Sequence, residues 1–249
     1  MISKYDLIYK EGLLFDLHLP ESDTFDLFVY IHGGGLQAGN RQRVEVFAKT
    51  LAEHNIATAS IEYRMYPTAK FPEFIEDCAY AVRWLKDNIS EYGKCNRLFV
   101  GGSSAGGYLS MMLCFDDRYF EAVGMKPTDI TAYIHDAGQP TSHFNVVKEL
   151  GNDPRRVIVD ETAPLYFVGM KEKYSPMLFI VSDNDMFARY EQTTLMVKTL
   201  EHFGHTDTVA LDVRCGEHCE YVYKSDENGN GQFANLILNF LKNQGLINK

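Results

Sequence analysis

The pentapeptide Gly102-Ser103-Ser104-Ala105-Gly106 constrains the fold of this chain more than any other stretch. It follows the β-rich run Arg97-Leu98-Phe99-Val100 and precedes residues 105–114, whose apolar side chains recur on a helical period. A strand, a tight glycine turn and a helix in this order predict a sharp elbow that exposes Ser104 at the carboxyl edge of a sheet. The glycines suit such a turn because a side chain at either end would crowd the serine.

The length and composition predict a single globular domain over residues 1–249. Hydrophobic residues make up 45% of the 249 residues and charged residues 23%, which is enough apolar material for a sizeable core. The formal net charge is −10, from 34 acidic and 24 basic residues. Nucleic acids and anionic membranes both require a positive face, so we expect neither as a partner.

The amino-terminal residues and the cysteines indicate a cytoplasmic protein. Residues 1–6 carry charges and do not form the apolar run of a signal peptide. No stretch approaches the ~20 apolar residues of a membrane span. The five cysteines are odd in number and lack C-x-x-C spacing, which is typical of reduced thiols. The oligomeric state is left open, a homo-oligomer included.

Strand and helix patterns alternate along the chain. Apolar or alternating runs predict strands, and apolar residues three or four apart predict helices. The predicted strands are 13–19, 26–32, 56–61, 98–100, 130–135, 177–181 and 208–213, and the predicted helices are 43–54, 72–92, 105–114, 190–203 and 233–241. This alternation predicts an α/β fold with a mostly parallel central sheet and helices on both faces. Because a short turn links the first two strands, we expect them to form an antiparallel addition at one edge.

About forty residues between the strands near 135 and 177 do not fit this alternation. They are rich in Pro, Gly, charged and aromatic residues. A connection of that length in a compact domain is usually functional or carries small helices. We therefore predict a small cap at about 140–175 over the carboxyl edge of the sheet, with Phe144, Tyr166, Phe167 and Tyr174 as candidate lining residues.

A glycine triplet ends the predicted strand 26–32. His32-Gly33-Gly34-Gly35 would lie at the same carboxyl edge as Ser104, and its backbone N–H groups would face a small volume free of side chains. The Ala105 N–H would add a donor at the positive end of the following helix. Donors fixed in this way suit an oxyanion hole, which stabilises the negative charge of a tetrahedral intermediate.

A serine nucleophile requires a base and a carboxylate that orients it. After strand 177–181 the sequence Ser182-Asp183-Asn184-Asp185 offers two carboxylates, and the residues alone leave both open. After strand 208–213 it offers His218. His205 precedes that last strand and His135 precedes the acid, so both are out of the order serine, acid, histidine.

These landmarks resemble the H-G-G-G branch of the α/β-hydrolase-fold serine esterases, which includes hormone-sensitive-lipase-like carboxylesterases and small bacterial acyl hydrolases. The resemblance runs from about Asp26 to His218. It rests on the glycine triplet, the elbow with Gly107, the acid and the base, together with the pairs Tyr63-Arg64, Phe71-Pro72 and Glu76-Asp77.

The resemblance implies a mechanism and selects among the carboxylates. In the family the acid follows a strand-ending glycine by three residues; Ser182 occupies that place, which selects Asp185. Ser104 would attack an ester, His218 would accept its proton, and Gly34, Gly35 and Ala105 would form the oxyanion hole. Leu36 stands where the family usually has a bulky aromatic residue, so we expect a different pocket wall there. The long amino-terminal cap of many relatives has no counterpart here.

The expected activity is the hydrolysis of small or short-acyl carboxylic esters through an acyl-enzyme, with no cofactor and no metal. Residues 226–231 resemble half of a calcium loop, but Ile237 occupies the position of its bidentate glutamate. An amidase such as an arylformamidase would use the same residues and stays an alternative. A peptidase or a non-catalytic small-molecule receptor of the same fold are two further alternatives.

Overall fold

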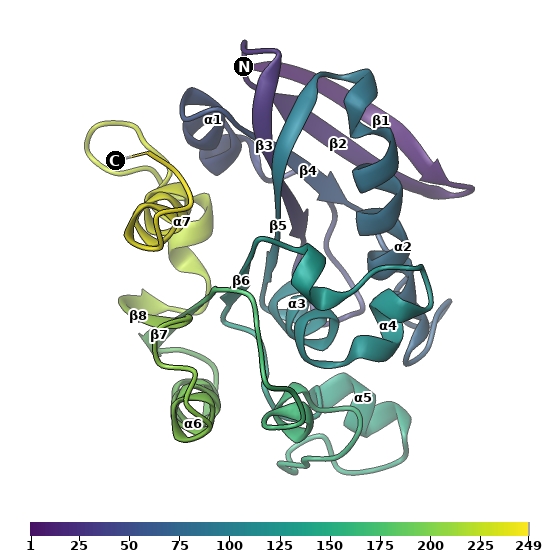
Figure 1. Cartoon of the computed structure of the whole chain (residues 1–249). Helices are drawn as coiled ribbons and strands as arrows, with labels where there is room; N and C mark the ends of the chain where they lie inside the picture. Colours follow the sequence, from purple (N-terminus) through teal and green to yellow (C-terminus); the bar gives the residue numbers. More distant parts are fainter. Residues whose placement is uncertain (249) are drawn as a thin grey trace.

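The computed structural model describes residues 1–248, which form one eight-stranded sheet with the order β1-β2-β4-β3-β5-β6-β7-β8 (Figure 1). The strands are β1 Ile2–Lys10, β2 Leu13–Leu19, β3 Thr24–Ile31, β4 Ile56–Ile61, β5 Lys94–Ser103, β6 Ala132–Asp136, β7 Met177–Asn184 and β8 Val209–Glu217. From β4 to β8 neighbouring strands are parallel. The predicted α/β class is confirmed.

The antiparallel edge is confirmed, but its strands differ from the prediction. β2 pairs antiparallel with β1 and with β4, whereas β3 lies inside the sheet and pairs parallel with β4 and β5. Every residue of β3 after Thr24 is buried, and a strand covered on both faces belongs in the sheet interior. The sequence patterns missed β1, because most of its side chains are exposed at the sheet edge.

The helices follow the predicted ranges closely. They are α1 Glu45–Glu53, α2 Glu73–Asn88, α3 Ala105–Phe115, α4 Asp117–Glu121, α5 Phe144–Glu149, α6 Arg189–His202 and α7 Gln232–Asn243. α2 begins one residue after Pro72, and its last predicted turn is a separate 3-10 turn at Ile89–Glu91. α4 and α5 were not predicted, because each is too short to produce a helical period.

Two apolar layers hold the helices against the sheet. α2, α3 and α6 pack on one face, where Phe15, Ile75 and Met112 belong to one cluster of buried side chains. α1 and α7 pack on the other face, where Phe47 and Phe233 meet edge-to-face with ring centroids 5.3 Å apart. Figure 1 shows these two helix layers on opposite sides of the strands. The hydrophobic core therefore consists of two layers of side chains, one on each face of the sheet.

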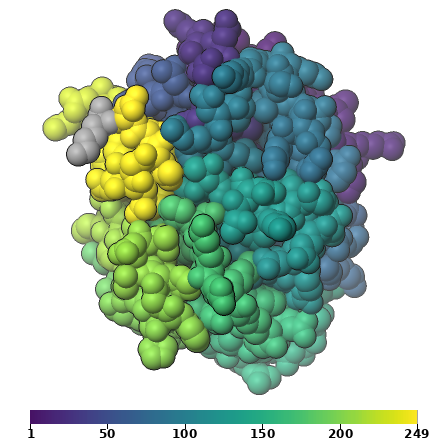
Figure 2. Space-filling view, in the orientation of Figure 1, coloured from purple at the N-terminus to yellow at the C-terminus, as the bar shows by residue number. Residues whose placement is uncertain are grey.

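The segment 140–175 contains α5 and a 3-10 turn at Pro164–Phe167. It is tied to the elbow helix, since the Tyr108 hydroxyl donates to the Thr162 carbonyl at 2.7 Å. Lys70 and Glu149 form an ion pair of 2.9 Å at its outer side. Figures 1 and 2 place the green part of the chain, which includes this segment, at the lower end of the molecule.

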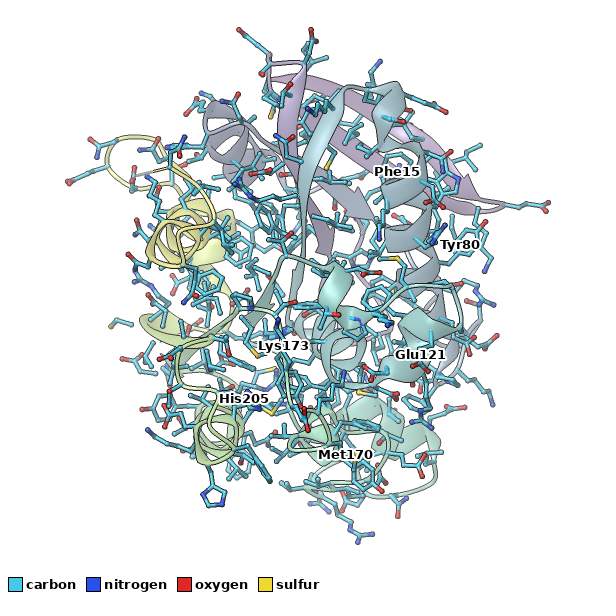
Figure 3. All side chains as sticks on the ribbon, viewed as in Figure 1. Phe15, Tyr80, Glu121, Met170, Lys173 and His205 are labelled. Atoms are coloured by element: carbon cyan, nitrogen blue, oxygen red, sulfur yellow. The ribbon has the colours of Figure 1, made fainter. Side chains whose placement is uncertain are left out.

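A surface cleft of about 440 Å³ opens beside this segment, away from the elbow. Glu121, Met170 and Lys173 lie around it and are labelled in Figure 3. Tyr174 also lines this cleft, and its ring lies 4.8 Å from that of His205. No helix within residues 1–248 has the length and apolarity needed to cross a membrane.

Candidate active site

Ser104 occupies a strained backbone position at the junction of β5 and α3. Its φ and ψ are 58° and −116°, a region that side-chain-bearing residues rarely adopt. Its N–H donates to the Asp136 carbonyl at 2.8 Å, which anchors the turn to β6. A Cβ placed on Gly102 or Gly106 would lie 2.4 or 1.9 Å from the Ile31 carbonyl oxygen, so neither position accepts a side chain. The predicted elbow is confirmed.

The side chains of Ser104, His218 and Asp185 are hydrogen-bonded in series. Ser104 Oγ lies 2.8 Å from His218 Nε2, and His218 Nδ1 lies 2.5 Å from Asp185 Oδ1. The three residues come from the carboxyl ends of β5, β8 and β7, which converge at one edge of the sheet. With the proton on Nδ1, the imidazole presents its free Nε2 lone pair to the serine hydroxyl.

The environment keeps Asp185 ionised. Burial raises the pKa of its carboxyl, but the hydrogen bond and charge of His218 and the backbone N–H groups of Ser182 and Met186 outweigh burial and hold the pKa below its usual value. Asp183 points elsewhere and accepts from the Gly216 N–H at 3.0 Å. Of the two carboxylates that the sequence left open, Asp185 therefore lies against the imidazole.

The other histidines have separate partners. His135 is fully buried, lies 2.8 Å from Ser110 Oγ, and has a pKa lowered to about 3 by burial, which keeps it neutral. His54 Nδ1 donates to the Thr50 carbonyl at 3.0 Å. Among residues 1–248, His218 is the histidine within hydrogen-bonding distance of Ser104.

The glycine triplet lies directly against the elbow. A Cβ on Gly33 would lie 3.1 Å from Ser104 Cβ, and Gly34 and Gly35 adopt φ values of +122° and +65°. Within residues 1–248, the N–H groups of Gly34, Gly35 and Ala105 donate to no backbone acceptor. Unused donors beside a serine hydroxyl are what an oxyanion hole requires.

Three contacts hold the glycine loop in place. The His32 and Tyr63 rings stack with centroids 4.5 Å apart, and the Tyr63 hydroxyl donates to the His32 carbonyl at 3.0 Å. Asn145 Nδ2 of α5 donates to the Gly35 carbonyl at 2.5 Å. The sequence patterns missed Asn145, because an amide in a segment without a motif carries no local signal.

Arg64 and Asp77, one residue from each of two sequence pairs in the family resemblance, form a forked ion pair beneath the glycine loop. Arg64 Nε and Nη2 donate to the two oxygens of the buried Asp77 carboxylate at 2.6 and 3.0 Å. Lys10 adds a third contact to the same carboxylate at 2.9 Å. A buried carboxylate with two cationic partners is satisfied, so this pair ties α2 to the loop after β4 that carries Tyr63.

A second acidic side chain, that of Asp136, lies beneath the hydrogen-bonded series of Ser104, His218 and Asp185. Asp136 is fully buried, and burial raises its pKa to about 6 despite the hydrogen bond that it accepts from Tyr221. The Tyr221 hydroxyl donates to one of its oxygens. Cys219 Sγ lies 3.7 Å from His218 Nε2 and fills the space next to the imidazole. No motif identified Asp136 or Tyr221 from sequence.

A cavity of about 710 Å³ opens above Ser104. Its floor is made by the glycine triplet, Ser104 and His218, and its walls include Phe144 and Met186. Leu36 is fully buried in the core and does not line the cavity, so the wall expected beside the triplet comes from elsewhere. Of the aromatic residues predicted to line a cap, Phe144 lies at this cavity, whereas Tyr166, Phe167 and Tyr174 do not.

The sequence predicts a site without a metal ion, and its one resemblance to a metal-binding loop, at residues 226–231, lacks the bidentate glutamate. Within residues 1–248, no group of three or more His, Cys, Asp or Glu side chains is arranged to hold a metal ion.

Comparison with known proteins identifies the family. The BD-FAE family model matches residues 15–200. The chain belongs to the BD-FAE family. That match begins within β2, includes the elbow and all of β7, and stops within α6, before His218.

Curated relatives of this BD-FAE protein include several esterases. The probable isoprenylcysteine alpha-carbonyl methylesterase ICMEL2 of Arabidopsis thaliana is 28% identical over 55% of this chain and 34% of its own length. The carboxylesterase NlhH of Mycobacterium tuberculosis is 34% identical over 36% of this chain and 29% of its own. The chain thus spans about a third of the length of these relatives.

Solved structures share the fold along the whole chain. Esterase 2 of Thermogutta terrifontis, phosphoramylated by tabun, matches with a TM-score of 0.80 and 18% identity over 99% of this chain and 96% of its own. The propionate-bound form of that esterase matches with a TM-score of 0.77 and 18% identity over 100% of this chain and 96% of its own. The BD-FAE protein described here therefore has the α/β-hydrolase fold.

Proposed function

We propose that this protein is a serine esterase that hydrolyses carboxylic esters of small or short-acyl substrates. The observation that carries the proposal is the unbroken series of hydrogen bonds from Ser104 Oγ through His218 to Asp185. A serine, a neutral imidazole and an ionised carboxylate in this arrangement make an activated nucleophile. The names of the curated relatives, among them a carboxylesterase and a carboxylic ester hydrolase, support the same reaction class.

In the proposed acylation step, Ser104 Oγ attacks the ester carbonyl carbon and His218 Nε2 takes the hydroxyl proton. The carbonyl oxygen becomes an oxyanion that accepts hydrogen bonds from the N–H groups of Gly34, Gly35 and Ala105. Asp185 stabilises the imidazolium that forms. The tetrahedral intermediate then collapses, the C–O bond to the alcohol breaks, and His218 returns its proton to the leaving alkoxide.

In the proposed deacylation step, a water molecule takes the place of the alcohol. His218 accepts a proton from the water as its oxygen attacks the acyl carbon of the Ser104 ester. The second tetrahedral intermediate uses the same three N–H donors. Its collapse breaks the bond to Ser104 Oγ, which regains a proton from His218 and releases the carboxylic acid. No metal or organic cofactor enters either step.

Two further features of the proposal concern the surroundings of the site. We assign residues 140–175 as a small cap of a single α/β-hydrolase domain, because α5 supplies Phe144 to the cavity above Ser104. We assign the protein to the cytoplasm, because its cysteines are free and a reducing compartment keeps thiols in that form.

The test compares Ser104→Ala with Ser103→Ala, whose side chains are neighbours in the same turn. Turnover of p-nitrophenyl acetate and butyrate should fall about 10⁴–10⁶-fold in Ser104→Ala. A fluorophosphonate probe should label the wild-type protein and Ser103→Ala, because the Ser103 hydroxyl is buried without a hydrogen-bond partner. Wild-type ester turnover by Ser104→Ala, or a wild-type protein that the probe does not label, would contradict the proposal.

The same assay separates the ester and amide alternatives. Formanilides and the matching phenyl formates present the same acyl group with different leaving groups. We expect the esters to have the higher kcat/KM, since the anilide is the more difficult leaving group to expel. A higher kcat/KM for the formanilide would reassign the protein as an amidase with the same three residues.

A further inference from the structure

A second cavity adjoins the one above Ser104. Its volume is about 540 Å³, and it shares Phe144 and Met186 with the active-site cavity as a common wall. Its other lining residues include Gln139, Val157, Phe187 and Arg189. Phe144 and Met186 lie between the two cavities, so the second cavity is a direct neighbour of the site above Ser104.

Arg189 lines this second cavity from the first turn of α6. Its side chain is buried, with 4% of the residue exposed. One Nη donates to the Ala137 carbonyl, and the other lies 3.5 Å from Gln139 Oε1. Its Nε is buried and has no hydrogen-bond partner within residues 1–248. A guanidinium has five N–H donors, so donors remain for a further partner.

The charge of Arg189 has no ion-pair partner within residues 1–248. Asp185 and Cys219 lie close enough to favour the charged guanidinium, but burial has the larger effect and lowers the pKa of Arg189. The Asp185 oxygens are already used by His218, Met186 and Ser182. Burial and the charge of Arg189 lower the pKa of the nearby His143 to about 3, so this imidazole is neutral and offers Arg189 no opposite charge.

A buried guanidinium without a carboxylate partner raises the free energy of the folded protein. Buried charges in proteins are normally paired, because the loss of hydration is offset only by an opposite charge and good hydrogen bonds. Arginine stays protonated even when buried, and its planar fork matches the two oxygens of a carboxylate. An anion with fork geometry that enters the second cavity from outside the protein would supply the missing partner.

The walls of the cavity suit an apolar chain that leads to such an anion. Phe187 is 96% exposed at the cavity, and Val157 is 61% exposed. An aromatic ring so exposed beside an opening makes apolar contact area available to a ligand. The rim carries Arg155, which pairs with Asp153, and Arg156, which is bonded to the neutral amide of Asn152. The rim is therefore positive rather than negative.

We propose that this second cavity is a substrate subsite for a carboxylate, carried at the far end of an apolar chain from the ester that Ser104 attacks, with Arg189 as the group that binds it. The inference rests on the proposed esterase activity, because the ester end of the substrate must lie at Ser104. It goes further by giving the substrate class: carboxylic esters whose acyl or alcohol part bears a carboxylate.

The first test uses pairs of esters of the same chain length in which a carboxylate replaces the terminal methyl group. On the acyl side, monomethyl adipate is compared with methyl hexanoate; on the alcohol side, 4-acetoxybutanoate is compared with butyl acetate. The wild-type kcat/KM should favour the anionic member by tenfold or more on one side, as expected for a charge-assisted hydrogen bond. Equal kcat/KM within both pairs would overturn the subsite.

The second test removes the guanidinium. In Arg189→Met the ratio of anionic to neutral kcat/KM should fall to about one, and Arg189→Lys should recover part of it, since an ammonium keeps the charge but loses the fork. The ratio is the readout because it cancels any general effect on turnover. Arg83→Met, which removes an exposed guanidinium of α2 that pairs with Asp87, is the matched control and should keep the ratio.

A binding measurement separates failure of the subsite from failure of the esterase proposal. Calorimetry should show that Ser104→Ala binds monomethyl adipate. Methyl hexanoate should bind to the same variant at least tenfold more weakly. One outcome is that the wild-type protein cleaves no ester while addition of Arg189→Met to Ser104→Ala abolishes the binding of monomethyl adipate. In that case the subsite stands and the esterase proposal fails. If neutral esters are cleaved but Ser104→Ala binds both compounds equally, the esterase proposal stands and the subsite is wrong.

Discussion

Asp185 Oδ1 lies 2.5 Å from His218 Nδ1, whereas Asp183, two residues earlier, is bonded to the backbone N–H of Gly216. The two carboxylates are near neighbours in sequence, yet the end of β7 turns only one of them toward the imidazole. This difference gives a matched pair of substitutions. Each changes a carboxylate to an amide of the same size.

We expect Asp185→Asn to lower kcat by about 10⁴, because an amide does not hold the imidazole in the tautomer that accepts the serine proton. Asp183→Asn should stay within a few-fold of the wild type, since the amide oxygen of asparagine can still accept from the Gly216 N–H. Steady-state kinetics on p-nitrophenyl butyrate measures both. Equal losses in the two variants would show that the 2.5 Å contact is not the one that matters.

Asn145→Leu should separate kcat from KM. Asn145 Nδ2 donates to the Gly35 carbonyl, so its loss frees the loop whose N–H groups we assign to the oxyanion. Deleting an oxyanion donor outright lowers kcat by about 10²–10³, and loosening one should lower it about tenfold with little change in KM. The control is Asn152→Leu, an exposed amide on the same segment. A rise in KM at constant kcat would instead indicate a role in ground-state binding.

Gly106→Ala should prevent correct folding of the elbow. The added Cβ would lie 1.9 Å from the Ile31 carbonyl oxygen, and backbone atoms of a central strand cannot move to relieve that contact. We expect a loss of about 3 kcal/mol or more in the free energy of unfolding. Gly204→Ala is the control, since its Cβ would meet no atom within 4 Å despite a φ of +88°. Urea titration of the two purified variants decides the comparison.

His135 should make the protein sensitive to acid. Its folded pKa is lowered to about 3 by burial, while in the unfolded chain it returns to about 6.5. Between these values the unfolded state binds a proton that the folded state does not. Stability is therefore present above pH 6.5 and is lost as the pH falls, by up to about 1.4 kcal/mol per pH unit.

The measurement is the free energy of unfolding of wild type and His135→Asn at pH 7, 6, 5 and 4. The variant should have the smaller decline, whatever its stability at pH 7. Asp136→Asn should change the slope the other way: burial raises the pKa of Asp136 to about 6, so its contribution is present below about pH 4 and is lost as the pH rises through 6. Parallel curves for all three proteins would refute both assignments.

The sequence predicted those parts of the site that have local chemical signatures. Glycines that flank Ser104 mark the elbow, because a Cβ at either of them is sterically excluded. The chain order of acid and base then identified His218, and the acid spacing of the family that the sequence resembles selected Asp185 over Asp183. β1 was missed because an edge strand with exposed side chains has no buried face to create a period. Arg189 was missed for another reason: an arginine at the start of a helix looks like a surface residue in sequence, and only packing in three dimensions makes it buried.

The backbone of Ser104 has a consequence for how this protein responds to selection. The surrounding chain holds Ser104 at a φ of 58° and a ψ of −116°. These strained angles lower the stability of the fold, and they place the serine hydroxyl at the cavity. Glycine adopts such angles without strain. A laboratory search for heat-resistant variants that ignores activity should therefore accept Ser104→Gly readily. Thermal tolerance and turnover compete at this one residue, and improved heat resistance has to be sought at positions away from the elbow.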